Sequence, residues 1–481
     1  MPELDAVIVG SGPNGLAAGV VLARAGLRVR LYEAESTLGG GARTAELTLP
    51  GFLHDVCSAV HPMALASPFF RAFGLDRRIE LRLPDVSYGH PLDGGIAGLA
   101  HRDIEATIAE LGADGRRWRS LMGPLVAHAR ELAEISGTSL VRFPRHPFVL
   151  AALGFRALEQ GGGGWNRRFS GEIAPAMLSG AFAHTNRALP DVGAASAGLV
   201  LAAHAHAAGW PIPVGGSQSI VDAMLADFTA HGGETVTGTR ITDLAELPSA
   251  KAVLLDITPR ALVELAGDRM PPSAATRLGR FRYGNAVSKV DYALDGPVPW
   301  TAEGLDRAGT VHLGGTRAQI VASERAVGGG VLPDAPYVLV AQPSIIDSTR
   351  APKGKHVLWA YTHVPPGSTD DRSEAITAQI ERFAPGFRDR ILESVSSTAI
   401  QTEAHNANYI GGDISAGDTS LWQLVSRPTL FTPWSTPIAG VYLCSASTAP
   451  GPGVHGMGGY DAAKLVLARE FGMRELPSLA P

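Results

Sequence analysis

A turn with three closely spaced glycines constrains the fold of this chain more than any other feature of its sequence. Residues 5–9, DAVIV, are typical of a strand that is buried on both faces of a parallel sheet. Gly10, Gly12 and Gly15 follow at once in G-x-G-x-x-G spacing, and residues 16–25 are rich in alanine and leucine, which favours a helix. This order predicts the first half of a βαβ unit.

The next residues complete that unit. Residues 27–33 alternate as a second strand, which ends at Glu33. Glu33 lies 33 − 12 = 21 positions after Gly12, close to the offset of about 20 expected for the acid that hydrogen-bonds a ribose. The glycines let the backbone approach a pyrophosphate, and the helix N-terminus supplies N–H groups and a positive dipole end. An ordinary glycine-rich turn is the alternative. The residues predicted to hold a dinucleotide here are Gly10, Gly12, Pro13, Asn14, Gly15, Glu33 and Ala34.

Composition narrows the class of protein. The chain has 481 residues, 45% of them hydrophobic and 18% charged, so we expect a folded protein of two domains. The formal net charge of −5, without a basic block, argues against a nucleic-acid partner. Cys57 and Cys444 alone provide no disulfide framework, no metal site and no CxxC redox pair. Without a basic leader or an apolar run of about 20 residues, we expect a cytoplasmic protein.

A second glycine cluster follows the ribose acid. Residues 36–46, STLGGGARTAE, contain three glycines and Arg43. This stretch resembles the second glycine motif of the flavin amine oxidase and phytoene desaturase superfamily, which wraps the pyrophosphate of FAD in those proteins. The resemblance implies that Gly40, Gly41 and Arg43 contact that pyrophosphate, a suitable role for a cation. A solvated surface arginine is the alternative for Arg43.

Two later segments resemble the same superfamily in the same order. Residues 213–244 contain a helical pattern and then strand-forming residues, which resembles the third piece of the FAD domain and implies an adenine contact near Ile241. Residues 440–470 predict a strand, a glycine- and proline-rich loop and a helix from about Gly458. The resemblance implies that this helix N-terminus, with Met457, points at the isoalloxazine and stabilises negative charge on the reduced flavin.

One departure from the superfamily concerns the end of that last strand. Many relatives have a Gly-Asp or Gly-Glu pair there, which holds the ribityl chain, whereas this chain has Ser445 and Ala446. We expect a serine hydroxyl, from Ser445 or Ser447, to replace the missing acid.

The resemblance covers nearly the whole chain and implies an α/β protein with two domains. Its closest branch is the phytoene dehydrogenase-like one, which includes pyridine nucleotide-disulfide oxidoreductase domain-containing protein 2. A Rossmann-type FAD-binding domain is expected from residues 1–75, 211–285 and 436–481, with an inserted α+β substrate domain from residues 76–210 and 286–435.

The cofactor expected from this resemblance is non-covalent FAD, without a dedicated NAD(P) site. The glycine runs at 161–164, 314–317 and 328–330 lack the strand before and the helix after that a second dinucleotide unit needs. Electrons are then expected to leave to oxygen, a quinone or a carrier.

Two residues are candidates for catalysis. Residues 282–300 contain Lys289 on an expected strand before a Pro-Trp pair, which resembles the amine oxidase region whose lysine holds a water at flavin N5. That implies a catalytic role for Lys289, and a lysine on a strand surface is the alternative. His455, two residues before Met457, is a candidate proton donor or acceptor, and a satisfied loop histidine is the alternative.

The resemblance implies removal of a hydride from a C–H bond to flavin N5, on an apolar, isoprenoid-like substrate. A redox-neutral isomerase or saturase, an amine oxidase and a flavin-free prenyl-protein chaperone of the same fold stay open. The amine oxidase is disfavoured because Met457 stands where its cage would have an aromatic ring. Residues 140–160 mix apolar and basic side chains, and predict either a lipid-facing lid with peripheral membrane contact or a core helix.

Overall fold

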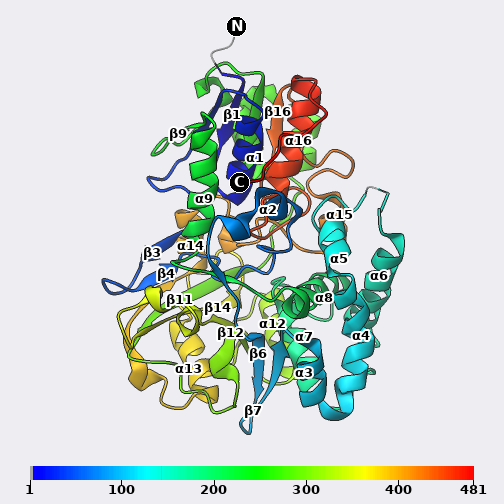
Figure 1. Cartoon of the computed structure of the whole chain (residues 1–481), viewed down its shortest axis with the longest axis vertical. Coiled ribbons are helices and arrows are strands. Elements are labelled where there is room, and N and C mark those ends of the chain that lie inside the picture. Colours follow the sequence, from blue (N-terminus) through cyan, green and yellow to red (C-terminus); the bar gives the residue numbers. More distant parts are fainter. Residues whose placement is uncertain (1–3, 142) are drawn as a thin grey trace.

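Two sheets of different kinds organise the computed structural model, which describes residues 4–141 and 143–481 (Figure 1). The first sheet is parallel and has five strands. In spatial order they are β16 (Val441–Leu443), β10 (Ala252–Leu255), β1 (Ala6–Val9), β2 (Val29–Tyr32) and β9 (Glu234–Val236). All five lie within the three segments predicted for the FAD-binding domain.

One face of this sheet packs against three helices: α1 (Pro13–Arg24), α9 (Gln218–Ala230) and α16 (Met457–Glu470). α1 begins at a proline, whose missing N–H costs nothing in the first helical turn. α1 packs so closely on α16 that a Cβ at Gly459 would lie 1.7 Å from the carbonyl oxygen of Asn14. The first and last helices of the chain are therefore direct neighbours.

The second sheet has seven strands and is mostly antiparallel; its only parallel pair is β6 with β12. In spatial order the strands are β15 (Ile391–Ser397), β11 (Ala286–Leu294), β14 (His356–Val364), β13 (Val338–Ala341), β12 (Ala308–Leu313), β6 (Val86–Leu92) and β7 (Ile96–His101). All seven lie within the segments predicted for the substrate domain.

The two faces of the second sheet bury different side chains, because successive residues of a strand point to opposite faces. Leu358 and Ala360 of β14 pack with α13 (Ser373–Phe383). Trp359 and Tyr361 of the same strand belong to the core that includes α7 (Ile173–Ala183) and α8 (Val192–Ala207). The face with Trp359 and Tyr361 therefore packs against α7 and α8.

α8 is the centre of the helical part. It contacts α7 and also α4 (Gly115–Ala127), α5 (Ala129–Ser136), α6 (Pro147–Gly161) and α15 (Leu421–Ser426). Burial among these helices explains why α8 consists mainly of alanine, glycine, leucine and valine. None of the described helices is long and apolar enough to cross a bilayer.

The remaining strands and α-helices complete the fold. The strands are β3 (Thr44–Glu46), β4 (Leu53–Asp55), β5 (Leu81–Arg82) and β8 (Ile212–Pro213). The α-helices are α2 (Pro68–Phe73), α3 (Ile104–Glu110), α10 (Pro259–Ala266), α11 (Pro272–Leu278), α12 (Arg317–Gly328) and α14 (Ala399–His405).

Candidate dinucleotide and substrate site

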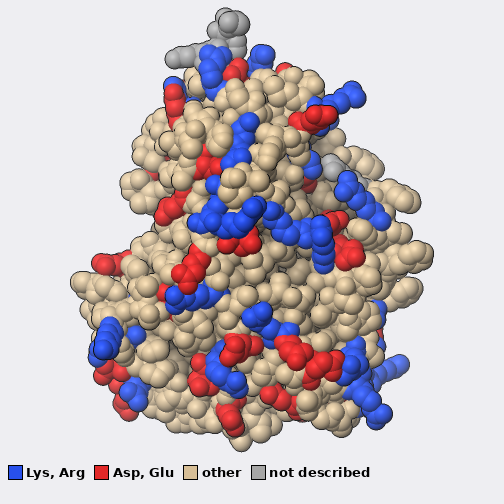
Figure 2. Space-filling model, in the orientation of Figure 1, with Lys and Arg blue, Asp and Glu red and all other residues tan. Residues whose placement is uncertain are grey.

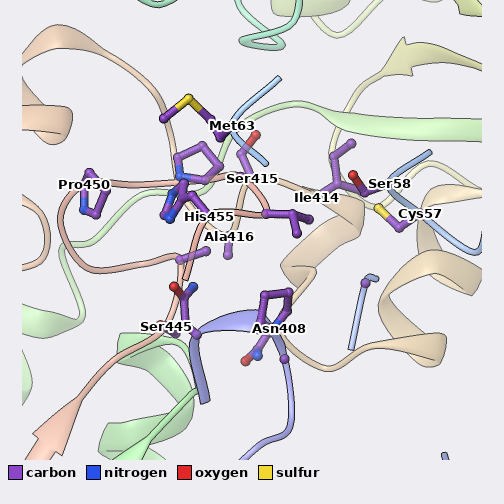
Figure 3. Close-up of a pocket in the computed structure, with 18 of the residues that line it drawn as sticks. Cys57, Ser58, Met63, Asn408, Ile414, Ser415, Ala416, Ser445, Pro450 and His455 are labelled. Carbon is purple, nitrogen blue, oxygen red and sulfur yellow. The ribbon is translucent and has the colours of Figure 1, made fainter. Parts of the chain in front are cut away.

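One cavity of about 900 Å³ joins the two sheets. It begins where the parallel strands end, the edge at which α/β sheets bind ligands, and continues between the second sheet and the helices. Figure 3 shows part of it, where residues far apart in the sequence, including Cys57, Asn408, Ser415, Ser445 and His455, surround one space. We call the end beside the parallel sheet the dinucleotide end and the remainder the chamber.

The first glycine turn is built without room for side chains. Gly10 has φ +97°, and a Cβ at Gly15 would lie 2.1 Å from the carbonyl oxygen of Gly10. A Cβ at Gly40 would lie 3.1 Å from the Cα of Gly12, so the two glycine loops rest against each other. Of the residues predicted for the two loops, those that line the cavity are Gly10, Gly12, Pro13, Asn14, Gly40, Gly41 and Arg43.

Glu33 lies at the carboxyl end of β2 and is oriented by the first turn. Its carboxylate accepts hydrogen bonds from the backbone N–H of Ser11 at 2.9 Å and from the Ser11 hydroxyl at 2.5 Å. The N–H of Thr239 donates to the Glu33 carbonyl, which brings the loop after β9 alongside. Ala34 and Ile241 line the cavity beside Glu33. This corner has the acid and the apolar wall that a ribose and an adenine require.

Arg43 is a buried cation that lines the cavity, and its side chain makes no ion pair within the described part of the chain. Its guanidinium donates to the Gly40 carbonyl at 2.8 Å, to the Thr37 hydroxyl at 3.0 Å and to Nε2 of His405 at 2.5 Å. Burial and the neighbouring Arg43 charge lower the pKa of His405, so its ring is neutral and accepts. A buried arginine without an acid suits an anion such as a pyrophosphate.

Asp256, at the end of β10, is a site residue that sequence reasoning missed. Its Oδ2 accepts the Gly15 N–H at 3.0 Å and would lie 2.6 Å from a Cβ at Gly12. Burial, with a smaller contribution from the Glu33 charge, raises the pKa of Asp256 to about 7 against the opposing Gly15 hydrogen bond. The sequence did contain a signal for Asp256. It directly follows an apolar run that predicts a strand, just as Glu33 directly follows β2.

The C-terminal segment approaches the cavity through its loop. Ser445, Ala446, Pro450 and residues 452–455 line it. Met457 and Gly458 do not; they lie in the core between α1 and α16, where the Gly458 N–H donates to Oδ1 of Asn14 at 3.1 Å.

Two further predicted cofactor contacts also lie outside the lining. Ser447 donates to the Ala416 carbonyl at 2.6 Å, and Gly15 is engaged with Asp256. Ser445, rather than Ser447, is the serine on the cavity wall.

His455 lines the cavity with both ring nitrogens engaged. Nδ1 accepts the Met457 N–H at 3.0 Å, and Nε2 lies 3.2 Å from the Gly451 carbonyl, to which it donates. Burial lowers the pKa of His455 to about 4, so the ring is neutral. This is the arrangement expected for the satisfied loop histidine, which here caps the first turn of α16.

Lys289 lies on β11 outside the cavity lining. Its ammonium is 2.5 Å from Oδ2 of Asp291 and donates to the Asp55 carbonyl at 3.1 Å. Burial raises the pKa of Asp291 to about 6, while Lys289 opposes the shift. Lys289 is 5.7 Å from the ring centroid of Trp359, which does line the cavity. The ammonium is thus paired behind the wall, and its catalytic role stays a prediction.

The chamber is lined largely by apolar residues that are distant in sequence. Leucines of α6 and α15 and their neighbours form one wall, namely Leu140, Leu150, Leu153, Leu158, Leu421 and Leu424. Trp210, Trp359 and Tyr361 form part of another. Among the described lining residues, the acids are Glu33, Glu35 and Asp256, and all three lie at the dinucleotide end.

Three comparisons with known proteins agree with this architecture. The family model described as an NAD(P)-binding Rossmann-like domain matches residues 8–73. Pyridine nucleotide-disulfide oxidoreductase domain-containing protein 2 of Rattus norvegicus is 26% identical over 97% of this chain and 93% of its own length. A 4,4'-diapolycopen-4-al dehydrogenase of Metabacillus indicus is 31% identical, over 26% of each chain. A putrescine oxidase double mutant has a TM-score of 0.57 at 16% identity, over 98% of this chain and 99% of that one.

The fold places the chain in the structural class of the amine oxidase fold, with a Rossmann-like unit at residues 8–73, as the sequence predicted. Within that class it resembles pyridine nucleotide-disulfide oxidoreductase domain-containing protein 2 along nearly its whole length. The predicted resemblance is confirmed.

Proposed function

We propose that this chain binds FAD non-covalently and removes a hydride from a C–H bond of an apolar substrate. One observation carries the proposal: a single cavity has glycine loops, Glu33 and the unpaired cation Arg43 at one end and an apolar chamber at the other. When bound, FAD supplies the hydride acceptor at its N5.

The residues at the dinucleotide end fit this cofactor. The glycine loops, with Arg43, would hold the pyrophosphate, because both loops line the cavity and the N-terminus of α1 begins directly after Gly12. Glu33 would hold the adenosine ribose, beside Ile241. Ser445 and Asn408 line the same cavity farther along the wall.

The chain's own contribution to the reaction is orientation and exclusion of water. The apolar walls of the chamber would hold a substrate by burial and would keep water from the reacting bond. His455, neutral and engaged at both nitrogens, would hold the loop before α16 in place.

The substrate class we propose is apolar and isoprenoid-like. A cationic amine would find no acid in the chamber, since the described acids lie at the dinucleotide end. The partial likeness to a diapolycopenal dehydrogenase supports the same choice, whereas the likeness to putrescine oxidase concerns the fold.

The test is anaerobic mixing of the purified, flavin-containing protein with a panel of isoprenoid hydrocarbons and amines. A dehydrogenase bleaches the flavin as product forms, and acid precipitation releases the flavin into solution. A redox-neutral isomerase converts the substrate without net bleaching, a saturase acts only on the reduced protein, and an amine oxidase bleaches with amines. A colourless protein that cannot be loaded with FAD would instead indicate the flavin-free chaperone.

Oxygen, a quinone or a carrier is the proposed acceptor of the electrons. Mixing the reduced protein with each in turn and following the return of the flavin absorbance distinguishes them. Reduction of the oxidised protein by NADH or NADPH at a catalytic rate would contradict the proposed lack of an NAD(P) site.

We also propose that the substrate enters from a membrane surface around α6. Phe143, Phe148 and Phe155 are 93%, 88% and 74% exposed. Leu158 and Leu421 are exposed and also line the cavity, so the outer apolar surface continues into the chamber. In Figure 2, few charged side chains lie over α6, at the right edge of the view. Within the predicted lid of residues 140–160, residue 142 lies outside the described residues.

A further inference from the structure

A pair of histidines at one end of the chamber has no part in the reaction proposed above. His184 follows the last residue of α7, and His312 lies on β12. Their Nε2 atoms are 2.8 Å apart, with ring planes at 85°. His184 lines the cavity, whereas His312 is fully buried behind it. The pair thus connects the chamber wall to the core.

The surroundings of His312 determine where its proton lies. Burial lowers the pKa of His312 well below its ordinary value and that of His184 to about 3, so each ring carries one proton. Among the described residues, Nδ1 of His312 has no hydrogen-bond partner, and it is packed against Gly180, where an added Cβ would lie 2.7 Å away. An unpaired N–H at this place would cost more than an unpaired lone pair. The proton of His312 is therefore on Nε2 and is donated to His184.

This assignment fixes the tautomer of His184. Because Nε2 of His184 accepts from His312, its own proton is on Nδ1. Within the described residues Nδ1 makes no hydrogen bond, and the ring borders the cavity. An N–H donor is thus available at the chamber wall.

Two more polar groups without partners belong to the same end. The hydroxyl of Thr310 and the indole N–H of Trp359 are buried without a hydrogen-bond partner in the described structure, and both residues line the cavity. Thr310 on β12 lies opposite Ala341 on β13, which lies opposite Trp359 on β14. The three residues therefore form a row across adjacent strands, on one face of the second sheet. Buried polar groups are normally satisfied, which indicates that a ligand group completes this set.

We propose that this end of the chamber binds a neutral oxygen, the carbonyl or hydroxyl group of an otherwise apolar substrate, with His184 Nδ1–H as the donor. The proposal rests on the proposed function in that it takes the chamber as the substrate site. A carboxylate is excluded as the head group, because the arginines among the described lining residues, Arg43 and Arg240, lie at the dinucleotide end, and no lysine joins them. The substrate class becomes an isoprenoid alcohol, aldehyde or ketone.

The experiment compares ligands that differ only in the head group. Geraniol, geranial and geranic acid are titrated against myrcene, a hydrocarbon of the same carbon skeleton, and farnesol is titrated against farnesene as a longer pair. Binding to the flavin-containing protein is followed by the change in flavin absorbance. We expect the alcohol and the aldehyde to bind about tenfold more tightly than the hydrocarbon or the ionised acid. Equal affinities, no binding by any ligand, or a preference for the acid would overturn the proposal.

Two substitutions at one position separate binding by His184 from its structural role. In His184→Asn the amide nitrogen replaces Nδ1 as a donor, whereas in His184→Gln the amide oxygen replaces Nε2 and accepts the N–H of His312. We expect His184→Asn to retain most of the preference for oxygenated ligands and His184→Gln to lose it. The reverse order would show that His184 acts only through His312.

The flavin content of each variant is measured before the titrations, and binding is also followed by the shift in thermal unfolding. If the protein holds no flavin, the thermal shift still tests His184, so a failure of the proposed cofactor and a failure of this site give different results.

Discussion

The two ends of the cavity are built by different means. At the dinucleotide end, backbone geometry leaves the space: glycines with no room for a Cβ, strand ends and one helix N-terminus. In the chamber, side chains from β12, β14, α6, α8 and α15 leave the space between them. The shape of the dinucleotide end is determined by short stretches of backbone. The shape of the chamber is determined by packing among side chains that are distant in sequence.

This difference predicts how each end responds to change. The glycine turns of the dinucleotide end should not tolerate even one added methyl group, because the neighbouring main-chain atoms cannot move aside. A chamber of side chains can adjust its volume at a smaller cost, since rotamers rearrange. The same glycine substitution should therefore have opposite results at the two ends.

The largest effect is expected from Gly15→Ala. The new methyl group would lie 2.1 Å from the Gly10 carbonyl oxygen, so the turn must open. We expect a loss of about 3 kcal/mol or more of stability and no retained flavin. The matched control is Gly154→Ala in α6, where an added Cβ would meet no described atom within 4 Å beyond its own turn of helix. This variant should gain up to about 1 kcal/mol. Urea unfolding measures both, and equal effects would contradict the distinction between the two ends.

A smaller effect is expected from removing the unpaired cation. Arg43→Met should lower the affinity for FAD by roughly 10- to 100-fold, the range of a charge-assisted hydrogen bond to phosphate. Arg240→Met is the control, because Arg240 also lines the cavity but its side chain is 57% exposed and lies 3.9 Å from Glu35. Titration of the apoprotein with FAD measures both. If the two variants lose affinity equally, Arg43 is not the pyrophosphate ligand.

The same contrast explains what the sequence predicted and what it did not. Local spacing indicates the first glycine turn and Glu33, and the family resemblance of residues 36–46 indicates Arg43. Gly10, Gly12, Glu33 and Arg43 line the cavity. His184, Thr310 and Trp359 come from three separate elements, and only the register of the second sheet and the packing of α7 bring them together. No spacing in the sequence indicates that these three residues lie close together in space.

The C-terminal segment shows the same limit of sequence reasoning. Sequence reasoning put Met457 and Gly458 at the flavin, but the helix begins at Met457 and packs directly on α1. The loop before it, not its first turn, therefore reaches the cavity. Glycines at the start of a helix indicate that another group comes close to its backbone. The sequence does not distinguish a ligand from a second helix in that position.

Asp256 offers a pH test of the dinucleotide end, with an expected change of about tenfold in FAD affinity. Because burial raises the pKa of Asp256 from 3.8 to about 7, the folded chain holds a proton that the unfolded chain has lost. Stability should therefore fall as pH rises from about 4 to about 7 and be level above that. The ionised carboxylate would also repel a pyrophosphate, so FAD should bind more weakly at pH 8 than at pH 6.

Asp256→Asn removes the titrating group. Glu33, Tyr409 and Cys444 are the other titratable groups that interact with Asp256, and all three are kept in the variant. We expect FAD binding by Asp256→Asn to be nearly independent of pH between 6 and 8. A pH dependence equal to that of the unchanged protein would assign the effect to another group.

The smallest effect is expected at the surface outside the chamber, and it concerns binding rather than folding. Phe148 and Phe155 lie one above the other on α6, seven residues apart, and both are mostly exposed. Replacing either with serine should change stability by less than about 0.5 kcal/mol and weaken binding to vesicles of neutral phospholipid about fivefold. Co-sedimentation with such vesicles measures this. Val331→Ser is the control, because Val331 is 59% exposed but is not among the residues that line the cavity or lie on α6. If all three variants bind vesicles like the unchanged protein, the substrate enters the chamber from solution. The exposed Phe148 and Phe155 then have another role.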